Sequence, residues 1–414
     1  MTKIQLPVII LVFALFVLEA AGAPPIVIHD GSGCLRQTEA PVTVVANLKP
    51  ALLKAAQRQR LAVSLTEAGE PQVLIPAQVE TNGLGKAEAV VFMMPAGPVR
   101  PSLGFKLVAA RDPLAGGVRV VERHDGQYDL LDSRAPVLRY NYRTVEPGEI
   151  ATLVSEGNRI YTRARSDYIH PLYGLGGEEL TLDWSLDHPH HRGIYWAWPE
   201  VDYGTERGDL HALQRVFARP TGKVRTQSGP VYAQVEAESE WIWEDREPIV
   251  KELATIRAYR TTARGRFIDL VFQFVALKAG VTVARRGTDK YGGLSIRLVQ
   301  PQGQEISVFT DPVGAKPGRA WSDLSGVFPG QSSASGLLVI QHRDNPDYPG
   351  EWVQYPELSW CQPTFPAGGS RYALVPGKPL VLHYRLWIHS GGKLSAENCA
   401  LAWDAFHAPE AAKP

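Results

Sequence analysis

The sequence predicts a mainly β protein, built around one large antiparallel β-sandwich that follows a small β-rich N-terminal domain. Short segments with alternating apolar and polar residues succeed one another from about residue 117 to 392. Gly, Pro and Asp turns separate these segments, and long helical periods are nearly absent, which favours a sandwich over an α/β plan. A chain of 414 residues exceeds one ordinary core. We therefore expect two domains, over residues 24–115 and 116–408.

The expected strands of the large domain share this alternation, which is clearest from Val381 to Trp387. The segments with the strongest strand character are 118–121, 137–142, 232–243, 249–259, 267–275, 294–298, 336–341 and 380–388. Residues 395–408 predict a C-terminal helix, with Ser395 as its N-cap.

The small domain has a mixed pattern. Residues 42–45, 61–65 and 89–93 have β character, and residues 49–60 predict a helix with Pro50 in its first turn. None of these segments carries obvious chemistry.

The first residues are typical of an export signal. Lys3 precedes an almost wholly apolar run at residues 6–18, and small residues follow at 20–23. The run is short for a spanning helix, which needs about 20 residues. We expect residues 1–22 to be a signal peptide cleaved after Gly22, with an uncleaved anchor as the alternative. The mature protein is then expected to be periplasmic or secreted and not to bind a membrane.

The composition limits which partners the chain can bind and how many disulfide bonds it can form. Lys and Arg together number 43, as do Asp and Glu, so the chain lacks the basic excess of a broad nucleic-acid surface. We expect no nucleic-acid partner. Three cysteines are few for an exported protein; Cys361 and Cys399 could pair, which would leave Cys34 over.

The densest group of candidate functional side chains lies at residues 183–198. It holds three of the eleven histidines, His188, His190 and His191, with Asp187 before them and Arg192 after them. A residue before proline is pushed towards extended geometry. We therefore expect His188 and His190 to share one face, with Asp187 and His191 on the other.

Three uses of this cluster stay open. The histidines could transfer protons or contact a polar ligand, they could bind a metal, or they could form a structural hydrogen-bond network. A metal at His188 and His190 is not favoured, because the remaining ligands would have to come from afar. No cofactor is therefore expected. Trp196 fits either a strand core or a surface that stacks on a sugar ring.

Several motifs resemble a bacterial family of exported proteins that has carried the name "methane oxygenase PmoA". The most specific is Asp187-His188-Pro189-His190-His191-Arg192-Gly193, followed by Trp196. The resemblance covers roughly residues 130–392. Other matching positions, in order, are His170-Pro171-Leu172-Tyr173, Trp241, Glu252, Asp269, Lys290, Gly292, Gly293, Ile296, Arg297, Asn345, Pro346 and Trp352. One difference is Asp209-Leu210-His211, where many members have Asp-Phe-Trp.

The family resembles in architecture the β-supersandwich of galactose mutarotase and related carbohydrate-active proteins. The resemblance implies a carbohydrate partner and histidine and carboxylate acid-base chemistry, so we expect an enzyme such as an epimerase, lyase or hydrolase. The alternatives are a non-catalytic glycan-binding module and, less favoured, a metal-dependent oxidoreductase. The implied catalytic residues are His188, His190, His191, Asp187 and Glu252, and the implied ligand contacts are Arg192, Trp196, Arg297, Lys290 and His170.

Overall fold

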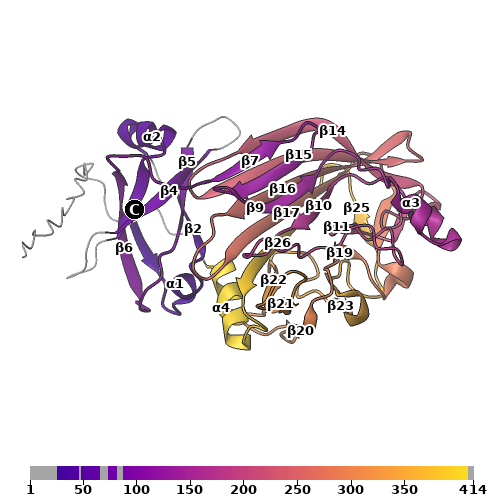
Figure 1. The fold of residues 1–414 in the computed structure, drawn as a ribbon. Coiled ribbons are helices and arrows are strands. Elements are labelled where there is room, and N and C mark those ends of the chain that lie inside the picture. Colours follow the sequence, from indigo (N-terminus) through magenta and orange to yellow (C-terminus); the bar gives the residue numbers. More distant parts are fainter. Residues whose placement is uncertain (1–25, 46–47, 66–72, 82–86, 409–414) are drawn as a thin grey trace, which may run out of the picture.

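The computed structural model describes residues 26–45, 48–65, 73–81 and 87–408 (Figure 1). The signal peptide predicted for residues 1–22 lies outside the described residues. The described part is mainly β, as the sequence predicts, and every strand pairing in its sheets is antiparallel.

A six-stranded sheet and two short helices form the N-terminal unit, at one end of the molecule in Figure 1. The sheet order is β1-β6-β3-β4-β5-β2. Helix α2 (Pro50–Gln57) starts with proline, as expected, but ends three residues earlier than the predicted segment. The other elements are β1 (Ile26–His29), α1 (Cys34–Thr38), β2 (Pro41–Val45), β3 (Leu61–Leu65), β4 (Val73–Thr81), β5 (Ala87–Met93) and β6 (Ser102–Ala109).

A second six-stranded sheet positions the histidines. Its order is β19-β11-β10-β9-β8-β7. Helix α3 (Ile150–Leu153) and a 3-10 turn (Glu156–Tyr161) connect β9 to β10, and the histidine segment connects β10 to β11. The strands are β7 (Val118–Glu122), β8 (Tyr128–Asp132), β9 (Ala135–Asn141), β10 (Tyr168–Leu172), β11 (Ile194–Ala197) and β19 (Gly293–Ile296).

An eight-stranded sheet of order β14-β15-β16-β17-β26-β22-β21-β20 forms the other layer. Its strands are β14 (Val216–Gln227), β15 (Tyr232–Trp243), β16 (Glu247–Tyr259), β17 (Arg266–Ala276), β26 (Leu380–Ser390), β22 (Ser335–Gln341), β21 (Ala320–Val327) and β20 (Gln302–Thr310). Two smaller sheets complete the domain: β13 (Glu206–Gly208), β12 (Glu200–Tyr203), β18 (Val281–Ala284) and β25 (Tyr372–Leu374); and β23 (Trp352–Tyr355) with β24 (Trp360–Pro363).

The main core lies between the two large sheets. Alternate residues of β16 and β17, such as Ile256 and Phe272, are buried in the same cluster as Ile194 and Trp196 of β11. The ring centroid of Trp196 lies 5.0 Å from that of Phe272 and 4.6 Å from that of Trp198. Trp196 is thus a core residue, and the expectation that it contacts a ligand does not fit its position.

A second core joins the N-terminal sheet to the opposite face of the eight-stranded sheet. Phe267 and Trp387, with ring centroids 5.4 Å apart, belong to this core, as does Trp403 of α4 (Ala396–Phe406). The side chain of Ser395 accepts a hydrogen bond from the backbone N–H of Asn398, so the predicted N-cap is confirmed.

The three cysteines are free and buried, so Cys361 and Cys399, whose pairing the sequence left open, do not form a disulfide. The two residues serve different packing contacts. Cys361 lies on β24 with its sulfur 2.8 Å from the hydroxyl of Ser322, whereas Cys399 lies on α4 in the second core. Burial raises the pKa of both thiols to about 12.

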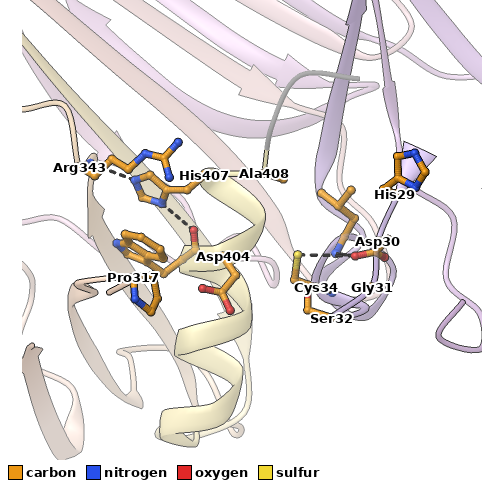
Figure 2. Close-up of a pocket in the computed structure, with 12 residues that line it drawn as sticks. His29, Asp30, Gly31, Ser32, Cys34, Pro317, Arg343, Asp404, His407 and Ala408 are labelled. Atoms are coloured by element: carbon orange, nitrogen blue, oxygen red, sulfur yellow. Dashed lines mark hydrogen bonds between the residues drawn. The ribbon is translucent and has the colours of Figure 1, made fainter. Parts of the chain in front are cut away.

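A cleft of about 240 Å³ lies between α4 and the segment of the N-terminal unit that connects β1 to α1 (Figure 2). Its polar groups already bond within the protein. Asp30 accepts hydrogen bonds from the backbone N–H groups of Leu35 and Arg36, and Nε2 of His407 accepts one from the backbone of Arg343.

Within the described residues, no helix is long and apolar enough to span a membrane.

Truncation of the core tryptophan tests the sandwich packing. Trp196→Ala removes a buried indole between the sheets, so we expect the free energy of unfolding to fall by about 3–5 kcal/mol in denaturant titrations. Val313→Ala, at a side chain that is 90% exposed, is the control and should change little. A loss below about 1 kcal/mol for Trp196→Ala would contradict the core assignment.

Candidate functional site

The histidine segment folds as a turn. The backbone N–H of His191 donates to the carbonyl of His188 at 2.9 Å, which closes a four-residue turn over Pro189. The predicted extended geometry is therefore wrong. Proline restricts only the residue before it, and its own fixed φ suits the second position of a turn.

This turn gathers all three histidines instead of separating them onto two faces. The ring centroid of His191 lies 4.9 Å from that of His188 and 4.7 Å from that of His190. Nδ1 of His188 lies 3.0 Å from a carboxylate oxygen of Asp187. The side chain of Asn158 donates to the carbonyls of Leu186 and Asp187, at 3.2 and 3.1 Å, and so holds the start of the turn.

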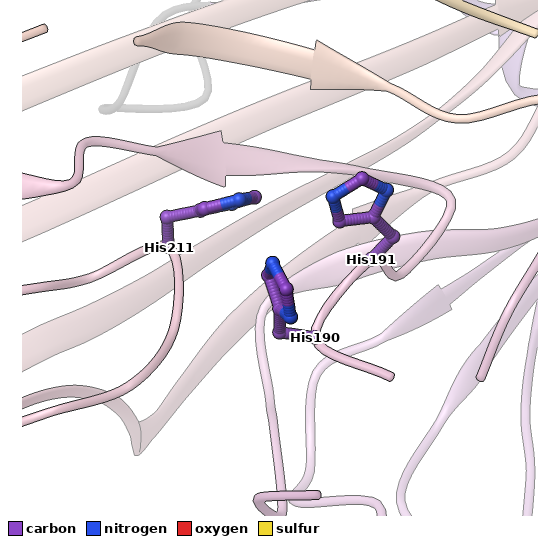
Figure 3. Close-up of side chains that lie close together, drawn as sticks. All are labelled: His190, His191 and His211. Carbon is purple, nitrogen blue, oxygen red and sulfur yellow. The ribbon is translucent and has the colours of Figure 1, made fainter. Parts of the chain in front are cut away.

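A fourth histidine, His211, completes the cluster from the connection between β13 and β14. Its ring centroid lies 4.5 Å from that of His190 and 5.3 Å from that of His191 (Figure 3). One ring nitrogen from each of these three residues falls within 4.8 Å of the other two. The sequence pointed to His211 only as a departure from the family pattern, because twenty residues separate it from the turn.

Two side chains hold His211 in place. The hydroxyl of Tyr195 lies 3.0 Å from Nδ1 of His211. The guanidinium of Arg165 donates to the carbonyls of Leu210 and His211, at 2.8 and 2.6 Å. Tyr195 and Trp196 alternate on β11, so the tyrosine faces away from the main core and towards the histidines. The site therefore lies on the outer face of the second six-stranded sheet.

Burial divides the four histidines into two groups. Burial lowers the pKa of His190 to about 3 and holds the pKa values of His191 and His211 well below the ordinary value, with further lowering from neighbouring positive groups. These three imidazoles are neutral near pH 7 and offer lone pairs. The side chain of His188 is 39% exposed and lies at the rim beside Asp187.

Aromatic rings surround the cluster. The ring centroid of Trp360, which is buried, lies 4.7 Å from that of His191. The ring centroid of Tyr161 lies 5.1 Å from that of His190, and the ring centroid of Tyr291 lies 5.4 Å from that of His211. Tyr355 stacks on Trp360, and all three of these tyrosines are half-buried. They give the cluster a rim of partly accessible aromatic faces.

Arg297 brings a buried positive charge to the site; burial lowers its pKa, and the nearby carboxylate of Asp187 opposes this effect. It follows β19, its backbone N–H donates to the carbonyl of Gly193, and its residue is buried. Nε and Nη1 of Arg297 have no hydrogen-bond partner within the described structure. Its charge helps to lower the pKa of His191, which indicates that the guanidinium lies near the cluster.

Three other predicted ligand contacts have different surroundings. Arg192 pairs with Asp183, and its guanidinium carbon lies 3.3 Å from the centre of the Trp184 ring. Nδ1 of His170, on β10, lies 3.1 Å from the hydroxyl of Thr181 and is already used in this hydrogen bond. Lys290 is exposed, and its backbone carbonyl accepts a hydrogen bond from Arg285.

Glu252 lies inside the sandwich rather than at the cluster. The indole N–H of Trp241 donates to Glu252 at 2.7 Å, and the carboxyl of Asp167, which accepts from the hydroxyl of Tyr140, is its acidic neighbour. Burial, together with the charge of Asp167, raises the pKa of Glu252 well above its usual value. Arg165, which bonds to the carbonyl of His211, also acts on both carboxyls through its charge.

The geometry can now be compared with known proteins. The model of a family of unknown function, DUF6807, matches residues 127–404. The chain belongs to this family. The matched region contains the whole histidine cluster and Arg297, whereas the N-terminal sheet lies outside it. None of the curated proteins compared with the chain matches it.

The acidic pair inside the sandwich predicts a pH dependence of stability. A raised pKa in the folded state means that Glu252 binds its proton more tightly when the protein is folded. Its contribution to the free energy of unfolding is fully present below the usual value of 4.5 and is lost as the pH rises through the raised pKa. Glu252→Gln mimics the neutral form, so this variant should lose less stability than the wild type as the pH rises above 4.5.

Urea titrations at several pH values measure this difference. Asp167→Asn serves as the partner variant, and its effect should overlap with that of Glu252→Gln rather than add to it, because the two carboxyls titrate together. Parallel stability curves for wild type and Glu252→Gln would contradict the assignment.

Proposed function

We propose that the protein is an exported enzyme that acts on a sugar or oligosaccharide at the histidine cluster. The observation that carries the proposal is the pair formed by His188 and Asp187. An imidazole that is reachable by solvent contacts a carboxylate at 3.0 Å, and its ring centroid lies 5.9 Å from that of His190 and 4.9 Å from that of His191. A carboxylate in this position fixes the orientation of the ring.

His188 takes the role of acid and base in this proposal. It is the histidine of the cluster that reaches solvent while contacting a carboxylate, whereas burial keeps His190, His191 and His211 neutral. Asp187 positions His188. Partial burial by itself would raise the pKa of Asp187, but hydrogen bonds from His188 and Ser185 outweigh this effect and lower it, so the carboxylate stays ionised.

The rim favours a sugar as the ligand. Tyr161, Tyr291 and Tyr355 present rings that are half-buried, which suits stacking on an apolar sugar face while their hydroxyls stay wet. The antiparallel sandwich agrees with the galactose-mutarotase-like architecture implied by the motifs, and a fold alone does not fix a function. The apolar leader at residues 6–18 supports a place of action in the periplasm or outside the cell.

Arg297 points to an acidic sugar. A buried guanidinium with two unpartnered nitrogens carries a desolvation cost that an anionic ligand group would offset. A carboxylate on a uronate fits the planar fork of this side chain. The proposed substrate class is therefore an oligosaccharide that contains uronic acid.

Replacement of the rim pair tests the catalytic role. His188→Gln keeps a polar side chain but cannot transfer a proton, so turnover of the responsive glycan in a panel of neutral and uronate-containing oligosaccharides should fall by about 100-fold or more. Binding measured by calorimetry should change little. His124→Gln, at an exposed turn between β7 and β8, is the control and should keep full turnover.

The same experiment separates an enzyme from a glycan-binding module. Measurable binding with unchanged glycan after long incubation would replace the catalytic proposal with a binding one. Equal turnover in wild type and His188→Gln would remove His188 from the mechanism.

Arg297→Gln tests the substrate charge. Loss of the guanidinium should weaken binding of uronate-containing oligosaccharides by about tenfold or more, because a charge-assisted hydrogen bond contributes on the order of 1.5–3 kcal/mol. Binding of neutral oligosaccharides of equal length should stay the same. Equal losses for both ligand types would contradict recognition of an anion.

A further inference from the structure

We propose that His190, His191 and His211 bind one divalent transition-metal ion, with zinc as the ion that best suits the three ligands. The proposal concerns the same site as the proposed function and does not depend on the substrate being a sugar. Within the described residues, these three form the one group of His, Cys, Asp or Glu side chains whose ligand atoms gather closely enough for an ion. Three imidazoles and an open fourth position are a recurrent arrangement for catalytic zinc.

The spacing fits an ion after a small adjustment. Two nitrogens, each about 2.0–2.1 Å from a tetrahedral zinc ion, lie about 3.3 Å apart. The three ligand atoms already lie within 4.8 Å of one another. Each ring therefore needs to shift by less than about 1 Å, which side-chain rotation can supply.

The hydrogen bonding of the rings leaves nitrogens for a ligand. Nδ1 of His190 and Nδ1 of His191 are buried without a hydrogen-bond partner among the described residues, as is Nδ1 of His188, which however lies 3.0 Å from the carboxylate of Asp187. Buried polar atoms are normally bonded, so two orphaned nitrogens in adjacent residues need an explanation. A metal ion supplies one, because either nitrogen of an imidazole can serve as a ligand.

His211 already has the outer contact of a metal ligand. The hydroxyl of Tyr195 occupies Nδ1 at 3.0 Å, which leaves Nε2 for the ion. Such a hydrogen bond on the far nitrogen fixes the tautomer and the orientation of ligating histidines. We assign Tyr195 as a positioning residue for the site.

The local charges restrict what fills the fourth position. Arg286 is paired with Asp209, but Arg297 has unpartnered nitrogens beside His191. A metal cation near this guanidinium gains from an anion between them. The fourth ligand is therefore an anionic oxygen, such as hydroxide or the carboxylate of a ligand.

A second histidine group shows the contrast. The ring centroid of His342 lies 5.3 Å from that of His383 and 4.6 Å from that of His407. However, both nitrogens of His407 contact backbone groups, those of Arg343 and Trp403, and the backbone N–H of Asp344 donates to Nδ1 of His342. These nitrogens are already used, which makes His342 a matched control.

The experiment uses the whole protein purified without a histidine tag. After dialysis against chelator, Zn²⁺ is titrated by calorimetry and Co²⁺ by its visible absorption, and bound metal is counted by elemental analysis. We expect one equivalent per chain in wild type and in His342→Ala. His211→Ala and His190→Ala should each weaken Zn²⁺ binding by at least about 100-fold, and Tyr195→Phe by about tenfold, because it removes only an outer contact.

Two histidine variants are used in order to separate a loss of metal binding from a loss of the fold. His211 is buried, so His211→Ala could lose its fold, whereas His190 is only partly buried and its variant should keep the thermal midpoint of the metal-free wild type. Weakened binding in folded His190→Ala with retention in His342→Ala supports the site. No stoichiometric metal in wild type, or equal affinity in His190→Ala and wild type, overturns it.

Metal binding and glycan turnover are read separately. Turnover by a protein that takes up no metal would overturn the metal site and leave the proposed function standing. Stoichiometric metal with no turnover on any glycan would support the site and count against the proposed function.

Discussion

The alternation of side chains along β11 is the constraint on which the site depends. Ile194 and Trp196 point into the main core, so Tyr195 and Ala197 must point to the other face of the sheet. The inward residues make this orientation costly to reverse, because a shift of one residue would expose a buried indole. Tyr195 is thereby fixed beside His211, and the turn that precedes β11 delivers His188, His190 and His191 to the same face.

The layer beneath the histidines adds rigidity from the other side. Arg165 donates to the backbone carbonyls of Leu210 and His211, and its charge also lowers the pKa values of Asp167 and Glu252 inside the sandwich, against the raising effect of burial. Arg165 thus connects the position of His211 with the charge of the acidic pair.

Local patterns in the sequence predict the fold well. Alternation along β15 to β17 and β26 gives the sandwich, the proline of α2 and the serine cap of α4 mark helix starts, and the DUF6807 match covers the same region. The motif also identifies three histidines that gather at one site. These features depend on interactions between residues that are close in sequence, so a local pattern is enough to predict them.

The remaining features depend on contacts between distant segments. His211 reaches the cluster from another connection, and its spacing from His190 carries no signal of that contact. The motif residue Arg192 pairs with Asp183, and the motif residue Trp196 packs in the core, because motif membership does not tell which side of a strand a residue faces. Cys361 and Cys399 remain unpaired because one lies on β24 and the other on α4.

The central claim is that the imidazoles of His190, His191 and His211, on the outer face of the second sheet, are placed close enough together to bind one common ion. Anomalous diffraction at the zinc absorption edge, from crystals grown with Zn²⁺ and without a histidine tag, tests it most directly. The account predicts a single strong peak enclosed by His190, His191 and His211, with Tyr195 still contacting Nδ1 of His211. Rings that bond only to one another or to water, with no peak between them, would contradict it.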